Sequence, residues 1–248
     1  MMTRFALGLL AQSSIHVRPA SCDASVDALY SGVAREEATQ WPCVGVSDMH
    51  EALEARALAG ASVGGVQLLL LPVRSLEKAY MWVTCPGVLK RFAEALDRKD
   101  VKKALKTIKL ARAQALCNAG GGALFLEELN FEIVGEVAGA ITAALEQLVA
   151  HEETRSRLGE QLVVVNDEDF SWFVRCAVPI ATRSRLNAVK IREKLWYEEV
   201  LAADTLFYAQ LSEADADLRA ALLDDPYLQV GAQETSGRGW FHAIYREY

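Results

Sequence analysis

The chain has 248 residues, of which 52% are hydrophobic and 24% are charged, so it is long enough to bury a substantial core and is not generally disordered. Its formal net charge of −7 argues against simple electrostatic binding of nucleic acid, although a local basic face can coexist with an acidic remainder. The five cysteines form no Cys-x-x-Cys pair, which excludes the usual zinc and disulfide patterns and predicts a reducing, cytoplasmic location. No apolar run approaches the length of a membrane span, so no membrane partner is expected.

In the first half of the chain, hydrophobic patterns predict strands and helices in alternation. Strands are expected at residues 3–12, 66–73 and 80–84. Four consecutive leucines in the second of these segments indicate a fully buried strand. Ser47 is expected to cap the N-terminus of a helix, and Pro86 is expected in the first turn of another helix that runs to Leu96.

The second half continues the alternation. Strands are expected at residues 125–134, 162–165, 182–191 and 206–210. Asn166 or Asp167 is expected to cap a helix over residues 168–177, and Ser212, with Asp215 near the capping-box position, is expected to open a later helix. Strands interleaved with single helices favour an α+β sheet with helices on one face and a ferredoxin-like or RRM-like core.

One segment, residues 98–112, is strongly basic, with seven Lys or Arg residues against one Asp. Its apolar residues Val101, Leu105 and Ile108 have the spacing of an amphipathic helix. Two interpretations stay open. The basic side chains line a groove for an anionic partner, or they form the solvated face of a helix.

A glycine-rich turn lies at residues 231–240. Gly237 and Gly239 permit a positive φ or a close approach of the backbone to another backbone or to a phosphate. Arg238, between them, is then placed to reach a phosphate or a neighbouring subunit. A glycine-rich segment alone is most often only a turn, so the meaning of this one depends on the motifs that accompany it.

Several segments, taken in order, resemble one protein family. They lie at residues 71–76, 82–92, 126–132, 195–199 and 204–208, and the glycine-rich turn completes the set. Together they are similar to the RAMP-type backbone subunits of Cmr (type III-B) CRISPR effector complexes, and the similarity runs over most of the chain. Any one of these segments alone would not be specific.

The resemblance implies an α+β, modified RRM-like (ferredoxin-like) fold with an inserted thumb, in a single RAMP domain over residues 1–248. It also implies that copies of the chain stack as a filament along a guide crRNA, together with target RNA and other effector subunits. In the family, the thumbs kink the guide–target duplex. An Asp in a loop near the N-terminus supports metal-dependent cleavage of target RNA, which implies a divalent ion such as Mg²⁺ as cofactor.

The family's catalytic Asp can be carried over to this sequence in two ways. The family pattern is His-Val, a glycine-rich loop and then Val-Asp, and here His16 and Val17 are present but the loop has lost its glycines. Counting forward from His16 places Asp27 at the catalytic position, whereas counting backward from Arg35 places Tyr30 there. A phenol does not bind Mg²⁺ as a carboxylate does. Asp27 therefore predicts a metal-dependent endonuclease, and Tyr30 predicts a degenerate scaffold that binds RNA without cutting it.

The resemblance also implies a set of residues that contact RNA. They are Arg18, Ser47, Arg74, Lys90, Arg91, Gly237, Arg238 and Gly239. Ser47 lies where the family places a Gly-Ser-Ser-hydrophobic-Lys-Gly turn, whose backbone amides and Lys meet guide phosphates at a helix N-terminus. Here the Lys is replaced by His50, and acidic residues occur at Asp48, Glu51 and Glu54. Because carboxylates repel phosphate, we expect this end of the guide-binding site to be weaker.

Overall fold

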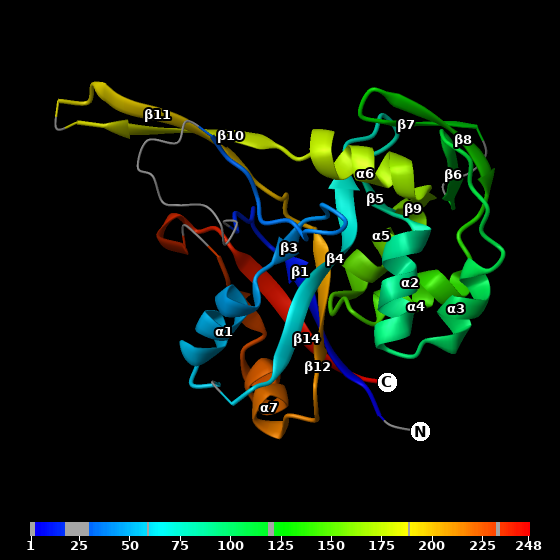
Figure 1. Cartoon of the computed structure of the whole chain (residues 1–248), viewed down its shortest axis with the longest axis horizontal. Coiled ribbons are helices and arrows are strands. Elements are labelled where there is room, and N and C mark those ends of the chain that lie inside the picture. The colour runs from blue at the N-terminus through cyan, green and yellow to red at the C-terminus, as the bar shows by residue number, and fades with distance from the viewer. Residues whose placement is uncertain (1–2, 18–29, 59, 119–121, 188, 232–233) are drawn as a thin grey trace.

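The structure is a computed structural model that describes residues 3–17, 30–58, 60–118, 122–187, 189–231 and 234–248. Within these residues the chain forms one large mixed sheet, a separate three-stranded sheet and two groups of helices (Figure 1). No helix in these ranges is long and apolar enough to cross a membrane. The expected single domain over residues 1–248 stays a prediction.

The large sheet is built from strands drawn from the whole length of the chain. They are β1 (Phe5–Ala11), β3 (Cys43–Val44), β4 (Val63–Val73), β5 (Met81–Thr84), β6 (Gln114–Cys117), β7 (Ala123–Leu126), β8 (Leu129–Gly135), β9 (Leu162–Val165), β12 (Leu206–Leu211), β13 (Tyr227–Gln229) and β14 (Trp240–Glu247). Their order is β13-β14-β1-β12-β4-β5-β9-β6-β8-β7, and β3 pairs with β4. The strands expected at 3–12, 66–73, 80–84, 162–165 and 206–210 are therefore confirmed as β1, β4, β5, β9 and β12.

Central strands of this sheet are buried on both faces, and helices cover them from both sides. Every residue of β1 after Phe5 is buried, and the leucines from Leu68 to Leu71 in β4 are each at most 2% exposed. The helices are α1 (Val46–Glu54), α2 (Pro86–Ala95), α3 (Lys99–Leu105), α4 (Gly139–Glu146), α5 (Glu152–Gln161), α6 (Asp167–Cys176) and α7 (Ala216–Asp224), with a short 3₁₀ turn η1 (Glu234–Ser236). Figure 1 places α1 and α7 on one side of β1, β4, β12 and β14, and α2 to α5 on the other. The expectation of helices on one face is wrong, because strands this apolar need cover on both faces.

The N-termini of α1 and α6 differ in whether a side chain caps them. α1 begins at Val46 after Gly45, which makes no side-chain cap, so Ser47 lies inside the first turn and is not the N-cap. In α6 the Asn166 side chain accepts a hydrogen bond from the Asp169 amide at 2.8 Å. Asn166 is therefore the capping residue of the two considered.

α7 begins later in the chain than Ser212, the residue expected to open this helix. Ser212 precedes the helix, and the Asp215 side chain accepts a hydrogen bond from the Leu218 amide at 2.8 Å. Asp215 supplies the capping oxygen, so the first helical residue is Ala216.

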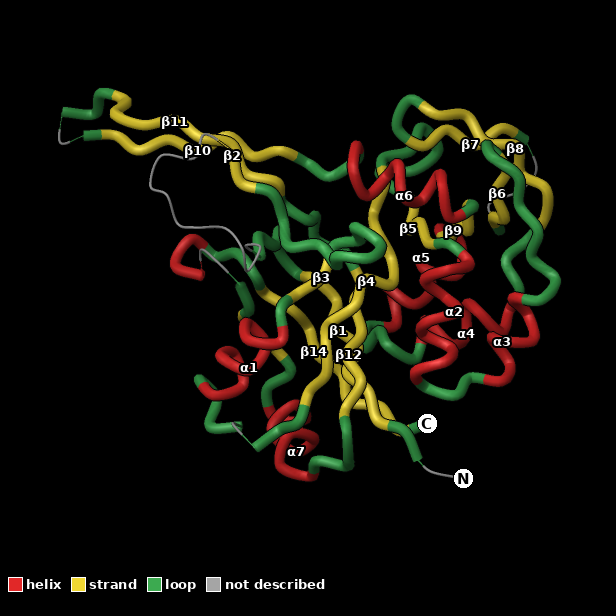
Figure 2. Tube along the Cα trace, viewed as in Figure 1, coloured by secondary structure: helices red, strands yellow, loops and turns green. Residues whose placement is uncertain are grey.

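The smaller sheet contains the most extended feature of the chain. It consists of β2 (Tyr30–Ser31), β10 (Ile180–Leu186) and β11 (Arg192–Glu199). β10 and β11 form an antiparallel hairpin that projects from the body of the chain, and β2 runs parallel to β11 (Figures 1 and 2). The single strand expected at 182–191 is wrong. Asn187 turns the chain there, and its side-chain oxygen accepts hydrogen bonds from the amides of Val189 and Ile191 at 3.1 and 2.9 Å.

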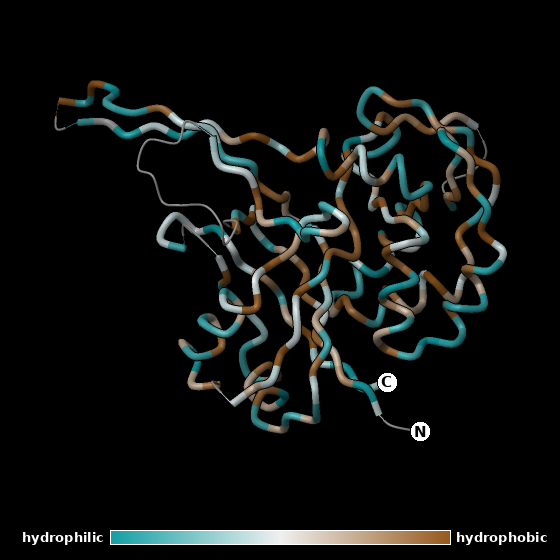
Figure 3. Tube along the Cα trace, in the orientation of Figure 1, coloured by the Kyte–Doolittle hydropathy of each residue, from teal (hydrophilic) through white to brown (hydrophobic). Residues whose placement is uncertain are grey.

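The strand expected at 125–134 is also two strands, β7 and β8. They are joined at Glu127, which has a φ of 50° and donates its amide to the Arg74 carbonyl at 2.9 Å. No glycine, proline or asparagine marks this turn. Figure 3 shows hydrophobic residues concentrated in the central strands, whereas hydrophilic residues occupy much of the β10–β11 hairpin.

Candidate functional site

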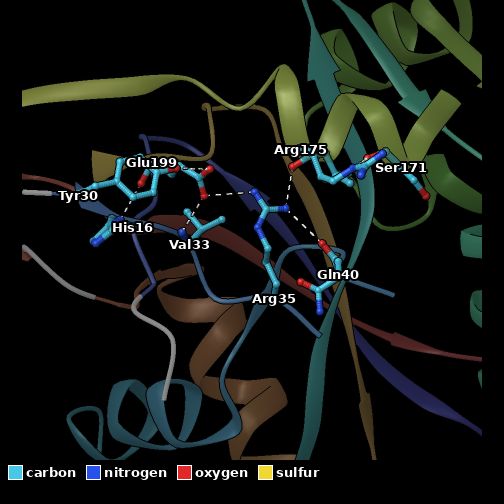
Figure 4. Close-up of polar contacts among 9 residues, drawn as sticks. His16, Tyr30, Val33, Arg35, Gln40, Ser171, Arg175 and Glu199 are labelled. Carbon is cyan, nitrogen blue, oxygen red and sulfur yellow. Dashed lines mark hydrogen bonds and ion pairs between the residues drawn. The ribbon is translucent and has the colours of Figure 1, made fainter. Parts of the chain in front are cut away.

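The base of the β10–β11 hairpin is held by the carboxylate of Glu199, the last residue of β11 (Figure 4). Its Oε1 accepts a hydrogen bond from the Tyr30 hydroxyl at 2.6 Å. Its Oε2 accepts from the Val33 amide at 3.0 Å and from the Arg35 guanidinium at 3.2 Å. The Glu199 side chain is only 11% exposed, so these contacts fix β2 firmly beside β11.

His16 and Arg35 connect this carboxylate to the rest of the chain. His16 is 1% exposed, with Nδ1 2.7 Å from the Glu199 carbonyl oxygen and Nε2 3.3 Å from Ser31 Oγ. Because a carbonyl oxygen only accepts, Nδ1 carries the proton and Nε2 accepts from the Ser31 hydroxyl. Arg35 also donates through Nη1 to the Val174 carbonyl at 2.7 Å, which links the network to α6.

The Tyr30–Glu199 pair has a defined protonation state at neutral pH. Burial acts to raise the pKa of the Glu199 carboxyl group, but the donors from Tyr30, Val33 and Arg35 outweigh burial and hold that pKa below its usual value. Burial first, and then the hydrogen bond and negative charge of Glu199, raise the pKa of Tyr30 to about 12. The pair is therefore a neutral phenol that donates to an ionised carboxylate.

Glu198, the neighbouring residue in β11, points to the opposite face of the hairpin. Its carboxylate accepts hydrogen bonds from Trp196 Nε1 at 2.6 Å and from Arg238 Nη1 at 3.2 Å, and it lies 3.5 Å from Arg183 Nε. The Arg238 and Glu198 side chains are 13% and 4% exposed. The guanidinium of Arg238 is thus engaged within the protein, and its expected contact with a phosphate stays a prediction.

Gly237 and Gly239, the Gly-x-Gly pair of the turn at 231–240, both have a positive φ, as Gly231 at the start of the turn does. φ is 77° at Gly237 and 80° at Gly239. A Cβ at Gly239 would lie 2.2 Å from the Val230 carbonyl oxygen, whereas one at Gly237 would meet nothing within 4 Å. The Gly239 amide donates to the Ser14 carbonyl at 3.1 Å. Position 239 therefore requires glycine because the backbone packs closely against Val230. Position 237 favours glycine only because of its positive φ.

Two of the other arginines expected to contact RNA are engaged with glutamates. Arg91 Nη1 donates to Glu36 at 2.6 Å, and its guanidinium lies 4.5 Å from the centre of the Trp41 ring. Arg74 pairs with Glu127, yet the Arg74 side chain remains 83% exposed. Arg74 is therefore accessible to a ligand, whereas Arg91 serves packing between α2 and the segment before α1.

Ser47 and Lys90 are exposed, on α1 and α2 respectively. Beside α1 a depression of about 270 Å³ separates this helix from the glycine-rich turn. It is lined by Asp48, Glu51, Gly231, Glu234 and Thr235. Burial, and then the nearby charge of Glu51, raise the pKa of Asp48. The lining is therefore acidic, and the expectation that this end of a guide-binding site is weak stays a prediction.

Asp27 and Arg18 lie outside the described residues. Within the described ranges, no group of three or more His, Cys, Asp or Glu side chains is placed to hold a metal ion. The carboxylates at the base of the hairpin, Glu198 and Glu199, are already bonded to arginines. The described residues therefore do not provide a preformed site for Mg²⁺.

A second basic feature, the β10–β11 hairpin, was not recognised from the sequence. Between residues 180 and 197 the hairpin carries five basic residues and one acidic residue. The basic residues are Arg183, Arg185, Lys190, Arg192 and Lys194. Basic residues at every second position on either side of Asn187 were the signal that could have revealed a basic hairpin.

The basic run at 98–112 forms α3 and the loop that follows it. Val101 is fully buried, whereas Lys103, Lys106 and Lys109 are exposed. This agrees with the amphipathic spacing. Figure 1 shows α3 at the opposite end of the molecule from the hairpin, so the two basic segments do not form one surface.

Comparison with known proteins places this geometry in context. A scan against protein-family models found no match. The CRISPR system Cmr endoribonuclease Cmr4 of Pyrococcus furiosus is 30% identical over 204 residues, which cover 75% of this chain and 69% of that protein.

Solved structures share the fold. The crystal structure of oligomeric Cmr4 from Pyrococcus furiosus covers 100% of this chain and is itself covered over 99%, with a TM-score of 0.72 and 22% identity. A chain in the cryo-EM structure of the type III-B Cmr-beta complex bound to cognate target RNA matches over 99% of this chain and 97% of its own length, with a TM-score of 0.74 and 16% identity. The expected α+β fold is therefore confirmed.

Proposed function

This chain belongs to the Cmr4 family, the RAMP-type backbone subunits of type III-B Cmr complexes. We propose that it binds a guide crRNA without reading the sequence of that RNA, and that copies of the chain stack along the RNA. Target RNA and other effector subunits are the further partners. A head-to-tail contact that does not close on itself generates a helical filament, which suits assembly along a linear guide.

The observation that carries this proposal is the basic β10–β11 hairpin. A chain with a net charge of −7 places five basic residues on one projecting hairpin. Phosphate contacts by Lys and Arg supply the sequence-independent part of nucleic-acid affinity. The hairpin therefore serves as the thumb that meets the guide–target duplex.

The network at the hairpin base supports the proposal, because it holds the base of the hairpin in a fixed position relative to the rest of the chain. Glu199 joins β11 to β2 and to Arg35, and Glu198 joins the opposite face to Arg238 of the glycine-rich turn. A ligand held by the hairpin is thus held at a defined position relative to β2. Pre-ordering of this kind lowers the entropic cost of binding.

We also propose that Asp27 supports cleavage of target RNA. It is the carboxylate that forward counting from His16 places at the family's catalytic position. Tyr30 itself donates to Glu199, which gives its side chain a structural role. A kinked RNA strand would align its own 2′-hydroxyl for attack on the adjacent phosphate. The new P–O2′ bond gives a 2′,3′-cyclic phosphate as the P–O5′ bond breaks, with the 2′ proton released to water and the leaving 5′ oxygen taking a proton from water. A divalent ion held by Asp27 and RNA phosphate oxygens would neutralise charge at that phosphate.

The second candidate function is a scaffold that binds RNA without cutting it. The acidic depression beside α1 supports this function, because Asp48, Glu51 and Glu234 line it, and carboxylates beside the helix that the resemblance assigns to guide phosphate would repel that phosphate. It predicts tight assembly on guide RNA and interference carried out by another subunit.

The deciding experiment uses the assembled complex, a labelled RNA complementary to the guide, and Mg²⁺. The wild type is compared with Asp27→Asn, and with Asp23→Asn as a matched control in the same segment. Evenly spaced products that disappear only in Asp27→Asn support the nuclease. Binding without products in the wild type supports the scaffold, and failure to bind guide RNA at all overturns both.

A further inference from the structure

Two tyrosines lie side by side at the base of the hairpin. Tyr30 in β2 and Tyr197 in β11 are register partners in a parallel pair, so their side chains project from the same face of the three-stranded sheet. They are 49% and 41% exposed. Aromatic rings are costly to leave in water, and a pair of them on one face marks a surface that a ligand can cover.

One ring of this pair is held in place by the protein. The Tyr30 hydroxyl donates to Glu199 Oε1 at 2.6 Å, and Glu199 lies two residues beyond Tyr197 on the same strand face. The hydrogen bond fixes the outer end of the Tyr30 ring while the ring remains half exposed. The ring is therefore ordered before any ligand arrives, which lowers the entropic cost of stacking.

The two faces of the hairpin differ in character. On the tyrosine face, Thr182 is the register partner of Tyr197, and Ile180 is 59% exposed. Neither of these two neighbours carries a charge, and the ionised Glu199 on the same face is 11% exposed and bonded to Tyr30, Val33 and Arg35. Register places Arg183 opposite Trp196, and Arg185 opposite Lys194, on the other face. The phosphates of a nucleic-acid strand bound at this hairpin would thus contact cations on one face. The bases of that strand would contact the uncharged tyrosine rings on the other face.

We propose that Tyr30 and Tyr197 form a stacking platform for one nucleobase of the RNA that the hairpin binds; this rests on the proposed RNA-binding function. Every base has a π-face, so a platform of this kind is tolerant of sequence. That tolerance is what a subunit binding a guide of any sequence requires. The cations of the same hairpin favour an RNA strand over an apolar protein segment as the occupant.

The test uses the purified full chain and a single-stranded RNA that carries one 5-bromouridine at successive positions. The affinity is measured by fluorescence anisotropy, and photocrosslinks are mapped by mass spectrometry. Tyr197→Ala, which leaves the Tyr30–Glu199 bond intact, is expected to weaken binding about 10-fold, whereas Tyr197→Phe keeps the wild-type affinity. Tyr227→Ala is the matched control, because Tyr227 is also 41% exposed but lies on β13.

Crosslinks at Tyr30 or Tyr197, together with the loss in Tyr197→Ala, support the platform. If Tyr197→Ala and Tyr30→Ala both bind within 2-fold of the wild type and no crosslink maps to either tyrosine, the platform is overturned. Should Arg185→Ala/Arg192→Ala still weaken binding in that case, the proposed RNA-binding function stands without it. A wild-type chain that binds no RNA overturns both. Thermal unfolding of Tyr30→Ala shows whether loss of the Glu199 contact has disturbed the fold.

Discussion

Arg238 and Glu198 form an ion pair at 3.2 Å, in which the two side chains are 13% and 4% exposed. The pair joins the glycine-rich turn to the base of the hairpin, two segments that lie 40 residues apart in the sequence. Glu198 also accepts from Trp196, so its charge keeps a partner when Arg238 is removed. The arrangement makes Arg238 a structural residue in the free protein, whatever it contacts in a complex.

Replacing this arginine tests that role. Arg238→Met is expected to lower the free energy of unfolding by about 2 kcal/mol, because a charge-assisted hydrogen bond to a buried carboxylate is lost while Trp196 remains. Urea unfolding at neutral pH measures the change. Arg219→Ala, at an exposed site on α7, is the control and is expected to shift stability by less than about 0.5 kcal/mol. Equal effects of the two substitutions would contradict a structural role for Arg238.

The two glycines of the turn are predicted to respond differently to alanine. Gly239→Ala is expected to cost about 3 kcal/mol or more, because its Cβ would lie 2.2 Å from a backbone oxygen at Val230. Gly237→Ala meets nothing within 4 Å and is expected to cost only about 1 kcal/mol for its positive φ. Thermal unfolding of both variants checks the ranking. A larger loss at Gly237 would show that the packing described at Gly239 is not what holds this turn.

Acidification is predicted to loosen the hairpin base. The pKa of Glu199 is lower in the folded chain than its usual value of about 4.3. Its ionised contacts therefore contribute fully above that value, and the contribution is lost as pH falls through the lowered pKa. Glu199→Gln removes this contribution, so its stability is expected to depend less on pH below about 4.3 than that of the wild type. Urea unfolding on both sides of this pH, with Glu193→Gln at an exposed site as control, provides the comparison.

The hairpin cations are predicted to set the salt dependence of RNA binding. Arg185→Ala/Arg192→Ala is expected to weaken affinity to a similar degree for unrelated RNA sequences. Loss of two phosphate contacts should also reduce the slope of log affinity against log salt by about 1.4 for single-stranded RNA. Fluorescence anisotropy over a salt series measures both. An unchanged slope would mean that RNA does not contact these two residues.

The parts of the fold that the sequence predicted are those specified by local pattern. The leucines at 68–71 marked β4, the apolar run at 162–165 marked β9, and Pro86 marked the start of α2. Two hairpins were instead expected as single strands, because Glu127 and Asn187 turn the chain without a neighbouring glycine or proline. Their strands have apolar residues on both sides of the turn, so hydrophobic periodicity shows no break.

The network at the candidate site could not be read from local spacing. Tyr30 and Glu199 lie 169 residues apart, and their hydrogen bond depends on β2 pairing with β11. Sequence motifs did identify the segment at 195–199 as characteristic, but gave Glu198 and Glu199 no role. Side-chain partners this distant become apparent only when tertiary structure brings the strands together.

The position of β1 has a consequence for how the protein is made. β1 lies between β12 and β14, so its hydrogen-bonding partners come from residues 206–211 and 240–247. On the ribosome, the apolar first strand has no partner on either edge until nearly the whole chain has emerged. Such long-range pairing slows folding and exposes unpaired edges in the nascent chain. Shielding of these few residues during translation is therefore expected to favour correct folding over aggregation of the nascent chain.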